Sequence, residues 1–340
     1  NYLARGYQGA PIAITVEGAN ILTRSMIIYG QGAIRCHPYV LAELEAATSS
    51  KMALNSEEPN ASDINKALDD FDHALFGHIG FALSNIGRSL WFSLTGSRLL
   101  LSPYHDKTKR YYQLLTRFSA NLAMLSDIAM LTIGGDLKRR ERISARLGDI
   151  LSHLYLASAT LKRFNDEGRK VDDLPLVQWA VEDSLFNIQQ AIEALIVNFP
   201  NKVVAGVLRS IIFPLGSWLS KPSDITDHQV AKILQTPSDT RNRLGYGQYL
   251  TREQGNVLGQ LEQTLEDILA CEPIFDKVCR TLNKSLPFYH LDKVAEQGLA
   301  SNAISEVEAD LLRKTELGRK LVIDVDDFDN DELTASNFSS

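Results

Sequence analysis

The stretch AITVEGANILTR, residues 13–24, contains one acidic residue, Glu17, between an apolar run and the start of an amphipathic segment. Burying an ionised carboxylate among apolar side chains costs free energy, because the charge loses its hydration. In a helix that begins here, the residues aligned with Glu17 form a polar row made of Asn20, Arg24, Gln31 and Arg35. A carboxylate at the apolar end of a polar row is a candidate general base.

Two opposing effects act on the acidity of Glu17. The N-terminal end of a helix dipole favours the carboxylate, whereas burial against Ile12, Ile14 and Val16 would favour the neutral acid. Two interpretations therefore stay open: a general base, or a glutamate that only caps the helix and does no chemistry.

Other catalytic motifs are absent from the sequence. It has no HExxH, no P-loop, no GxSxG and no GxGxxG after a strand, which argues against a metalloprotease, a nucleotide hydrolase and an α/β-hydrolase. The seven histidines are dispersed, and the spacing of five residues between His73 and His78 is poor for joint metal ligation on a helix. We therefore expect no metal site.

Composition excludes several classes of protein. The chain has 340 residues, 44% of them hydrophobic, and its formal net charge is -7 with the basic residues scattered, so nucleic acid is not an expected partner. Three cysteines without a CxxC pair indicate free thiols and a cytoplasmic location. The opening NYLARGYQG has neither an initiating Met nor a signal segment, so we expect the chain to be part of a longer protein.

Apolar residues recur at helical intervals, and no segment alternates as a strand would, so we predict an all-α fold of helical bundles. One stripe on the helix expected at 137–164 would face the core; it consists of Ile143, Leu147, Ile150, Leu154, Ser158 and Leu161. Ser62 is the expected N-cap of a long helix. The predicted helices cover residues 19–36, 39–48, 62–94, 107–133, 137–164, 174–198, 203–219, 227–234 and 252–282.

The helix expected at 203–219, VVAGVLRSIIFPLGSWL, allows two interpretations. It is too short to span a bilayer and contains Arg209 and Pro214, so it is not a transmembrane helix. It is either a core helix or an interfacial helix, with Trp218 and flanking lysines near lipid headgroups.

The segment ITVEGANILTRSMIIYGQGAIRCHPYV resembles the sequence around the catalytic Glu-Gly pair of the acyl-CoA dehydrogenase flavoenzymes. It is most similar to the large bacterial type that starts fatty-acid β-oxidation. Arg24 stands seven residues after Glu17, as in that family, and Asn20 matches its polar residue three after the Glu. Ala19 and Ile21 depart from the family pattern. The stretches ISARLGDILSHLYLASATLKRF and IIFPLG resemble the C-terminal extension of the bacterial type.

The resemblance implies an FAD-dependent oxidation of medium- or long-chain acyl-CoA to trans-2-enoyl-CoA. Glu17 would be the base, Gly18 would let the backbone approach closely, and Asn20 and Arg24 would bind substrate or cofactor. An electron-transfer flavoprotein or a similar acceptor, a homo-oligomeric state and peripheral contact with the inner membrane are further expectations. This chain alone is expected to be inactive.

The resemblance also divides the chain. Residues 1–48 would end the dehydrogenase helical domain, 49–322 would form the bacterial-type helical extension, and 323–340 would be an acidic, disordered tail. A non-catalytic helical interaction or membrane-docking module, with Glu17 only a cap, stays open as the alternative function.

Overall fold

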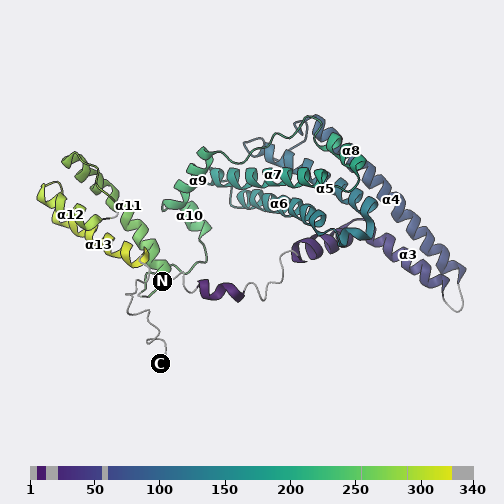
Figure 1. Cartoon of the computed structure of the whole chain (residues 1–340), viewed down its shortest axis with the longest axis horizontal. Coiled ribbons are helices and arrows are strands. Elements are labelled where there is room, and N and C mark those ends of the chain that lie inside the picture. The colour runs from purple at the N-terminus through teal and green to yellow at the C-terminus, as the bar shows by residue number, and fades with distance from the viewer. Residues whose placement is uncertain (1–5, 13–21, 56–59, 254, 289, 324–340) are drawn as a thin grey trace, which may run out of the picture. The chain divides into compact units, whose positions relative to one another are not determined.

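The computed structural model describes residues 6–12, 22–55, 60–253, 255–288 and 290–323. Within these ranges the chain forms helices and no β-strand, which confirms the predicted all-α class (Figure 1). The chain forms two compact units: a larger one, Val16–Ala231, and a smaller one made of Asn1–Thr15 and Lys232–Ser340. The predicted boundaries near residues 48 and 322 stay predictions, and this division inside the extension was not among them.

The core of the larger unit is built by three long helices, α5 (Lys109–Ile133), α6 (Glu141–Asp166) and α7 (Leu174–Val197). Short 3₁₀ turns connect them: η2 (Gly134–Lys138) precedes α6, and η3 (Val171–Asp173) precedes α7. Gly134 has a φ of 58°, a left-handed conformation that glycine adopts without steric cost, so the predicted chain reversal occurs here.

The predicted apolar stripe on α6 lies in the core, apart from one position. Ile143, Leu147, Ile150, Leu154 and Leu161 are buried, whereas Ser158 is exposed and Ala157 is buried in its place. A helix has 3.6 residues per turn, so a buried stripe must alternate steps of four and three. Between Leu154 and Leu161 the buried position is therefore Ala157, three residues after Leu154 and four before Leu161.

Helix α5 is a core helix, although its composition resembles that of a membrane span. Among the described residues, one segment, Lys109–Leu137, is long and apolar enough to cross a bilayer by length and composition. Its large side chains Phe118, Met124 and Leu125 are buried in the bundle. Their burial is sufficient to account for the apolar composition of this helix.

Helices α3 (Val40–Leu54) and α4 (Ala61–Leu94) pack against each other as a hairpin (Figure 1). The N-cap of α4 is Asn60, whose side chain accepts from the Ser62 amide, so the prediction of Ser62 as the cap was wrong. At Gly77 a Cβ would lie 2.4 Å from the Tyr39 ring, so only glycine permits this approach.

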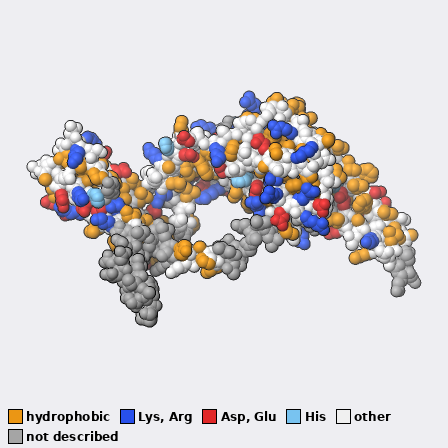
Figure 2. Space-filling view, in the orientation of Figure 1, with side chains coloured by type: hydrophobic (Ala, Val, Ile, Leu, Met, Phe, Trp, Pro, Cys, Tyr) orange, Lys and Arg blue, Asp and Glu red, His pale blue; other side chains and the backbone are white. Residues whose placement is uncertain are grey.

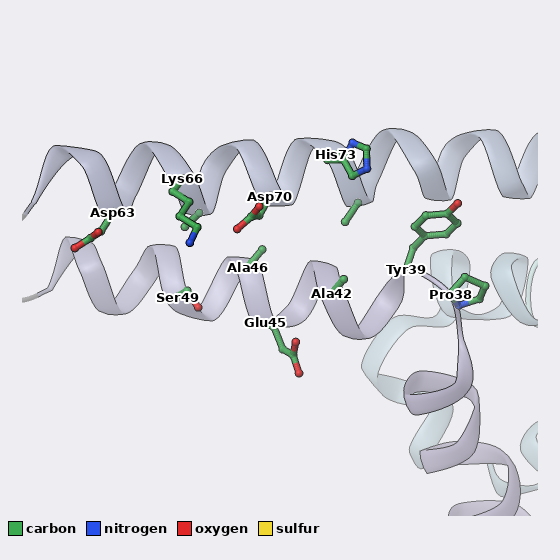
Figure 3. A pocket seen from close by; sticks show the side chains of 12 residues that line it. Pro38, Tyr39, Ala42, Glu45, Ala46, Ser49, Asp63, Lys66, Asp70 and His73 are labelled. Atoms are coloured by element: carbon green, nitrogen blue, oxygen red, sulfur yellow. The ribbon is translucent and has the colours of Figure 1, made fainter.

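Small residues line the α3–α4 contact. A groove of about 660 Å³ runs along it, bordered by Ala42, Ala46, Ala67 and Ala74 with charged side chains at its edges. Figure 3 shows that Lys66 and Asp70 come from α4, and that Glu45 points away from that helix. The groove is therefore lined by small side chains, with side chains of both charges at its edges.

The helix predicted at 203–219 is shorter in the structure. Helix α8 (Lys202–Ile212) ends before Pro214, and Phe213 leaves the helical region at φ -124°, ψ 52°. A proline disfavours helical geometry in the residue before it, so this prediction erred by continuing past Pro214. Ala205, Leu208 and Ile212 are buried, Leu219 packs against the core, and Trp218 is 52% exposed.

The smaller unit has its own core of α11 (Val257–Leu282), α12 (Leu291–Ala300) and α13 (Glu306–Ile323), which surround buried Cys271, Val278 and Leu312. Two short helices precede them, α9 (Asp224–Gln235), which crosses the boundary between the units, and α10 (Asp239–Leu244). Helix α11 starts later than the predicted residue 252, because Gly255 has a φ of 88°. The predicted acidic tail lies outside the described residues.

Candidate functional site

The predicted site residues are only partly described. Glu17, Gly18 and Asn20 lie outside the described residues, and Arg24 lies on the helical segment that follows them. The Arg24 Nε atom is 3.4 Å from Asp149 Oδ1 on α6, and both side chains are partly exposed. The roles assigned to these four residues therefore stay predictions.

The segment that follows Glu17 is helical, as expected for residues 19–36 in the part described, but it is not a uniform α-helix. It consists of the π-helical η1 (Leu22–Gln31) and the short α2 (Gly32–Cys36). A π-helix is wider than an α-helix, is rare, and is frequent near functional sites. This geometry was not readable from the residue pattern.

Segment η1 is fixed to the core by Tyr29. This side chain is 2% exposed, and its hydroxyl donates to Ser126 Oγ at 2.8 Å. Burial raises the pKa of Tyr29 above its usual range, so the phenol stays protonated and remains a donor. Segment η1 therefore has a fixed position on the bundle.

A second close contact joins η1 to α6 at Gly148. A Cβ at this position would lie 3.1 Å from the Arg24 carbonyl oxygen and 3.5 Å from Tyr29 Cβ. The backbone of η1 approaches α6 because Gly148 has no side chain. The bundle thus holds in place the helical segment that contains Arg24, seven residues after the predicted base Glu17.

The larger unit also contains a partly buried cluster of histidines and carboxylates, made of His37, Glu43, His78 and Asp127. His37 Nε2 is 2.9 Å from Asp127 Oδ1, and His78 Nδ1 is 2.8 Å from Glu43 Oε1. His78 Nε2 lies 3.7 Å from the same Asp127 oxygen. The cluster joins the start of α3 with α4 and α5.

The hydrogen bonds of His37 fix its tautomer. Its Nδ1 accepts from the backbone amides of Tyr39 and Val40 at 3.2 and 3.1 Å, so in the neutral ring the proton is on Nε2, which donates to Asp127. A metal bound at His37 Nε2 would need the opposite tautomer. The cluster therefore acts as a hydrogen-bonded charge network rather than a ready metal site.

The charge on Asp127 is not fully compensated. Burial raises the pKa of Asp127, while His37 and His78 oppose that effect, and its Oδ2 has no hydrogen-bond partner.

A second group of residues of the types that bind metal ions, His290, Asp292 and Glu316, lies in the smaller unit. There Glu316 is bound by Arg319 at 2.7 Å, so the carboxylate already has a cation.

Helices α4 and α5 also carry buried polar side chains at regular spacing. On α4 these residues repeat every four positions, and the same holds on α5: Asn85, Ser89 and Ser93 on α4, and Gln113, Arg117 and Asn121 on α5. Ser89 Oγ, Ser93 Oγ and both side-chain polar atoms of Asn121 have no hydrogen-bond partner. Buried polar groups without partners cost stability.

Sequence reasoning missed this cluster for a definite reason. It compared histidines close in sequence, whereas His37 and His78 are 41 positions apart and meet only because the α3–α4 hairpin folds back. The residue pattern shows instead a four-residue repeat of polar side chains on α4 and α5, which does not include His78 or Asp127. Such a repeat indicates a polar helix face that is either exposed or paired with another.

Comparison with known proteins assigns the chain to a family. Residues 34–328 match the model described as acyl-CoA dehydrogenase, C-terminal, bacterial type. No solved structure matches the chain. The match covers the α3–α4 hairpin, the three-helix core and helices α11 to α13 of the smaller unit, and it begins after the segment that carries Glu17. The chain therefore belongs to the acyl-CoA dehydrogenase family, as a C-terminal region of the bacterial type.

Proposed function

We propose that this chain is the C-terminal part of an FAD-dependent acyl-CoA dehydrogenase that converts medium- or long-chain acyl-CoA to trans-2-enoyl-CoA in fatty-acid β-oxidation. The observation that supports this most is the family match over residues 34–328, which lies C-terminal to a Glu-Gly pair of the family type at Glu17 and Gly18. The chain by itself is expected to be inactive.

In this proposal Glu17 accepts the proton from the substrate α-carbon, and the β-hydrogen leaves as hydride. The products are trans-2-enoyl-CoA and a protonated Glu17, so the base must lose its proton before the next turnover. A carboxyl with the usual pKa of about 4.3 is a weak base, and desolvation by the acyl chain would raise that pKa towards the working range. The backbone N–H of Glu17 would stabilise charge on the thioester oxygen.

FAD is part of this proposal because the acyl-CoA dehydrogenase family uses it as its cofactor. When bound, it would supply the acceptor for the β-hydride. Of the residues assigned to the site, only Arg24 is described, and its contact with Asp149 neither requires nor blocks a flavin. We therefore assign no flavin contact to any described residue. What this chain contributes is the position of η1, which Tyr29 fixes on α5 through Ser126 and which packs closely on α6 at Gly148.

The remaining expectations belong to the same proposal. An electron-transfer flavoprotein or similar acceptor would reoxidise the flavin, and the enzyme would be a homo-oligomer in the cytoplasm, in peripheral contact with the inner membrane. Basic and acidic side chains are interspersed on the face shown in Figure 2, which agrees with an enzyme that does not bind nucleic acid.

The alternative function, a membrane-docking module without chemistry, is favoured by one observation. On α8, Val203 is 77% exposed and Val207 is also exposed, on the side opposite the buried Ala205, Leu208 and Ile212. Replacing both valines by serine should then weaken binding to anionic vesicles. Val171→Ser, which changes an exposed valine away from α8, is the matched control.

The decisive experiment for the class of enzyme is an absorption spectrum of the full-length protein. We expect a bound-flavin band that is bleached when a long-chain acyl-CoA is added without an electron acceptor. A full-length protein that purifies without flavin and binds none when FAD is added would contradict the dehydrogenase proposal and favour the docking module.

A further inference from the structure

A pocket with three arginines lies in the larger unit, away from η1. It is formed by the end of α4, the start of α5 and the segment after α8, and its volume is about 390 Å³. Its lining includes the arginines and two apolar side chains that reach the surface: Arg98, Arg110, Arg117, Leu215 and Trp218. No carboxylate lines it.

The arginines of this pocket repel one another, and no carboxylate that lines the pocket compensates their charges. Burial and, to a smaller extent, the neighbouring Arg110 together lower the pKa of Arg117 to about 10. Burial also lowers the pKa of Arg110, and here the neighbouring charge is Arg98. No carboxylate contributes to either shift. Concentrating like charges in this way is unfavourable unless an anion compensates them.

Arg117 has a structural role that explains only part of this arrangement. It is 3% exposed, and its Nη2 donates to the Ile212 carbonyl at 2.6 Å, which satisfies the C-terminal end of α8. Its Nε has no hydrogen-bond partner, and neither does the buried Ser93 Oγ beside the same pocket. Capping α8 requires one guanidinium, and it does not account for Arg98 and Arg110.

The rim of the pocket is apolar and aromatic. The Arg110 guanidinium lies over the Trp218 ring at 5.3 Å from its centroid, a cation–π contact that holds the arginine at the mouth of the pocket. Leu94, Leu215 and Trp218 are exposed. A ligand suited to this site has a compact anionic group for the arginines and an apolar or planar part for the rim.

We propose that this pocket binds the phosphate group of a phosphate ester. A phosphate carries up to two negative charges and several acceptor oxygens, which matches a pocket lined by three arginines better than a single carboxylate would. The shared chemistry fits a soluble phosphorylated molecule and a phospholipid headgroup, and the test distinguishes the two. The inference does not rest on the proposed dehydrogenase function.

The first test uses the full chain and calorimetric titration with inorganic phosphate and pyrophosphate at constant ionic strength, with chloride as the reference anion. We expect saturable binding that is weakened about tenfold or more by Arg110→Gln or Arg98→Gln, because each removes one charged donor. Arg98 is exposed and Arg110 only half-buried, so both variants should fold. Arg139→Gln, which changes a highly exposed arginine outside the pocket, should bind like the parent.

The second test separates the two sources of phosphate. Vesicles of phosphatidylcholine with phosphatidic acid are compared with vesicles of phosphatidylcholine alone, for the parent and for Arg110→Gln. Binding of the free anions and of neither vesicle assigns a soluble phosphate ester, whereas Arg110-dependent binding of the phosphatidic acid vesicles assigns a lipid headgroup. The proposal is overturned if no phosphate form binds, or if Arg110→Gln and Arg98→Gln bind as Arg139→Gln does.

Discussion

Gly148→Ala tests whether α6 positions the segment that carries the predicted base. The added Cβ would lie 3.1 Å from the Arg24 carbonyl oxygen, so η1 must move away by a few tenths of an ångström. Within a helix, glycine to alanine alone stabilises by about 0.5–1 kcal/mol. Overpacking against backbone costs about 1–3 kcal/mol, so we expect a net loss of stability.

Gly80→Ala on α4 is the matched control, because a Cβ there meets nothing within 4 Å. It should show the full gain from helix propensity, so the two variants should differ by at least about 1 kcal/mol in urea unfolding monitored by circular dichroism. In the intact enzyme, Gly148→Ala should also slow flavin reduction by about threefold or more, since a misplaced base loses its alignment with the substrate. Equal stabilities and equal reduction rates for the two variants would refute this positioning role.

Two further predictions concern stability alone. Ser89→Ala removes a buried hydroxyl without a partner, so it should leave the free energy of unfolding unchanged or raise it by up to about 1 kcal/mol. Ser144→Ala removes a hydroxyl that donates to the Leu137 carbonyl, so it should lower the free energy of unfolding by about 1 kcal/mol. Denaturant midpoints that fall equally for both would contradict the assignment. The hydrogen bonds from Arg241 hold the pKa of Glu262 below its usual range, so Glu262 contributes stability above pH about 4.3, and that contribution disappears as the pH falls through the folded-state pKa. Glu262→Gln should therefore cost about 1 kcal/mol at pH 7, after allowance for partial exposure, and less at pH 3; a cost independent of pH would count against the ion pair.

Periodicity was sufficient to predict the helices of the core. The stripe from Ile143 to Leu161 identified the buried face of α6, because apolar side chains at helical spacing must face a partner. The errors arose where local conformation overrides periodicity. Pro214 ends α8 early, Gly255 delays the start of α11, and Asn60 rather than Ser62 caps α4.

The sites that depend on tertiary contacts could not be predicted from the residue pattern. His37, His78 and Asp127 come from three separate segments, and so do Arg98, Arg117 and Trp218. Local spacing carries no information on which helices pack together. The Glu-Gly pair could be identified from sequence because its residues are adjacent, and the π-helical form of η1 behind it could not.

The measurement that tests the central claim most directly is stopped-flow reduction of the full-length Glu17→Gln enzyme by a saturating acyl-CoA. Glutamine keeps the size of the side chain and cannot accept the proton, so flavin and acyl-CoA should still bind while reduction slows by about 10²- to 10⁴-fold. Glu45→Gln, the same change at an exposed position on α3, should reduce like the parent. If Glu17 only caps a helix, its replacement should cost at most about 1 kcal/mol of stability. A reduction rate within about threefold of the parent would then contradict the assignment of Glu17 as the base.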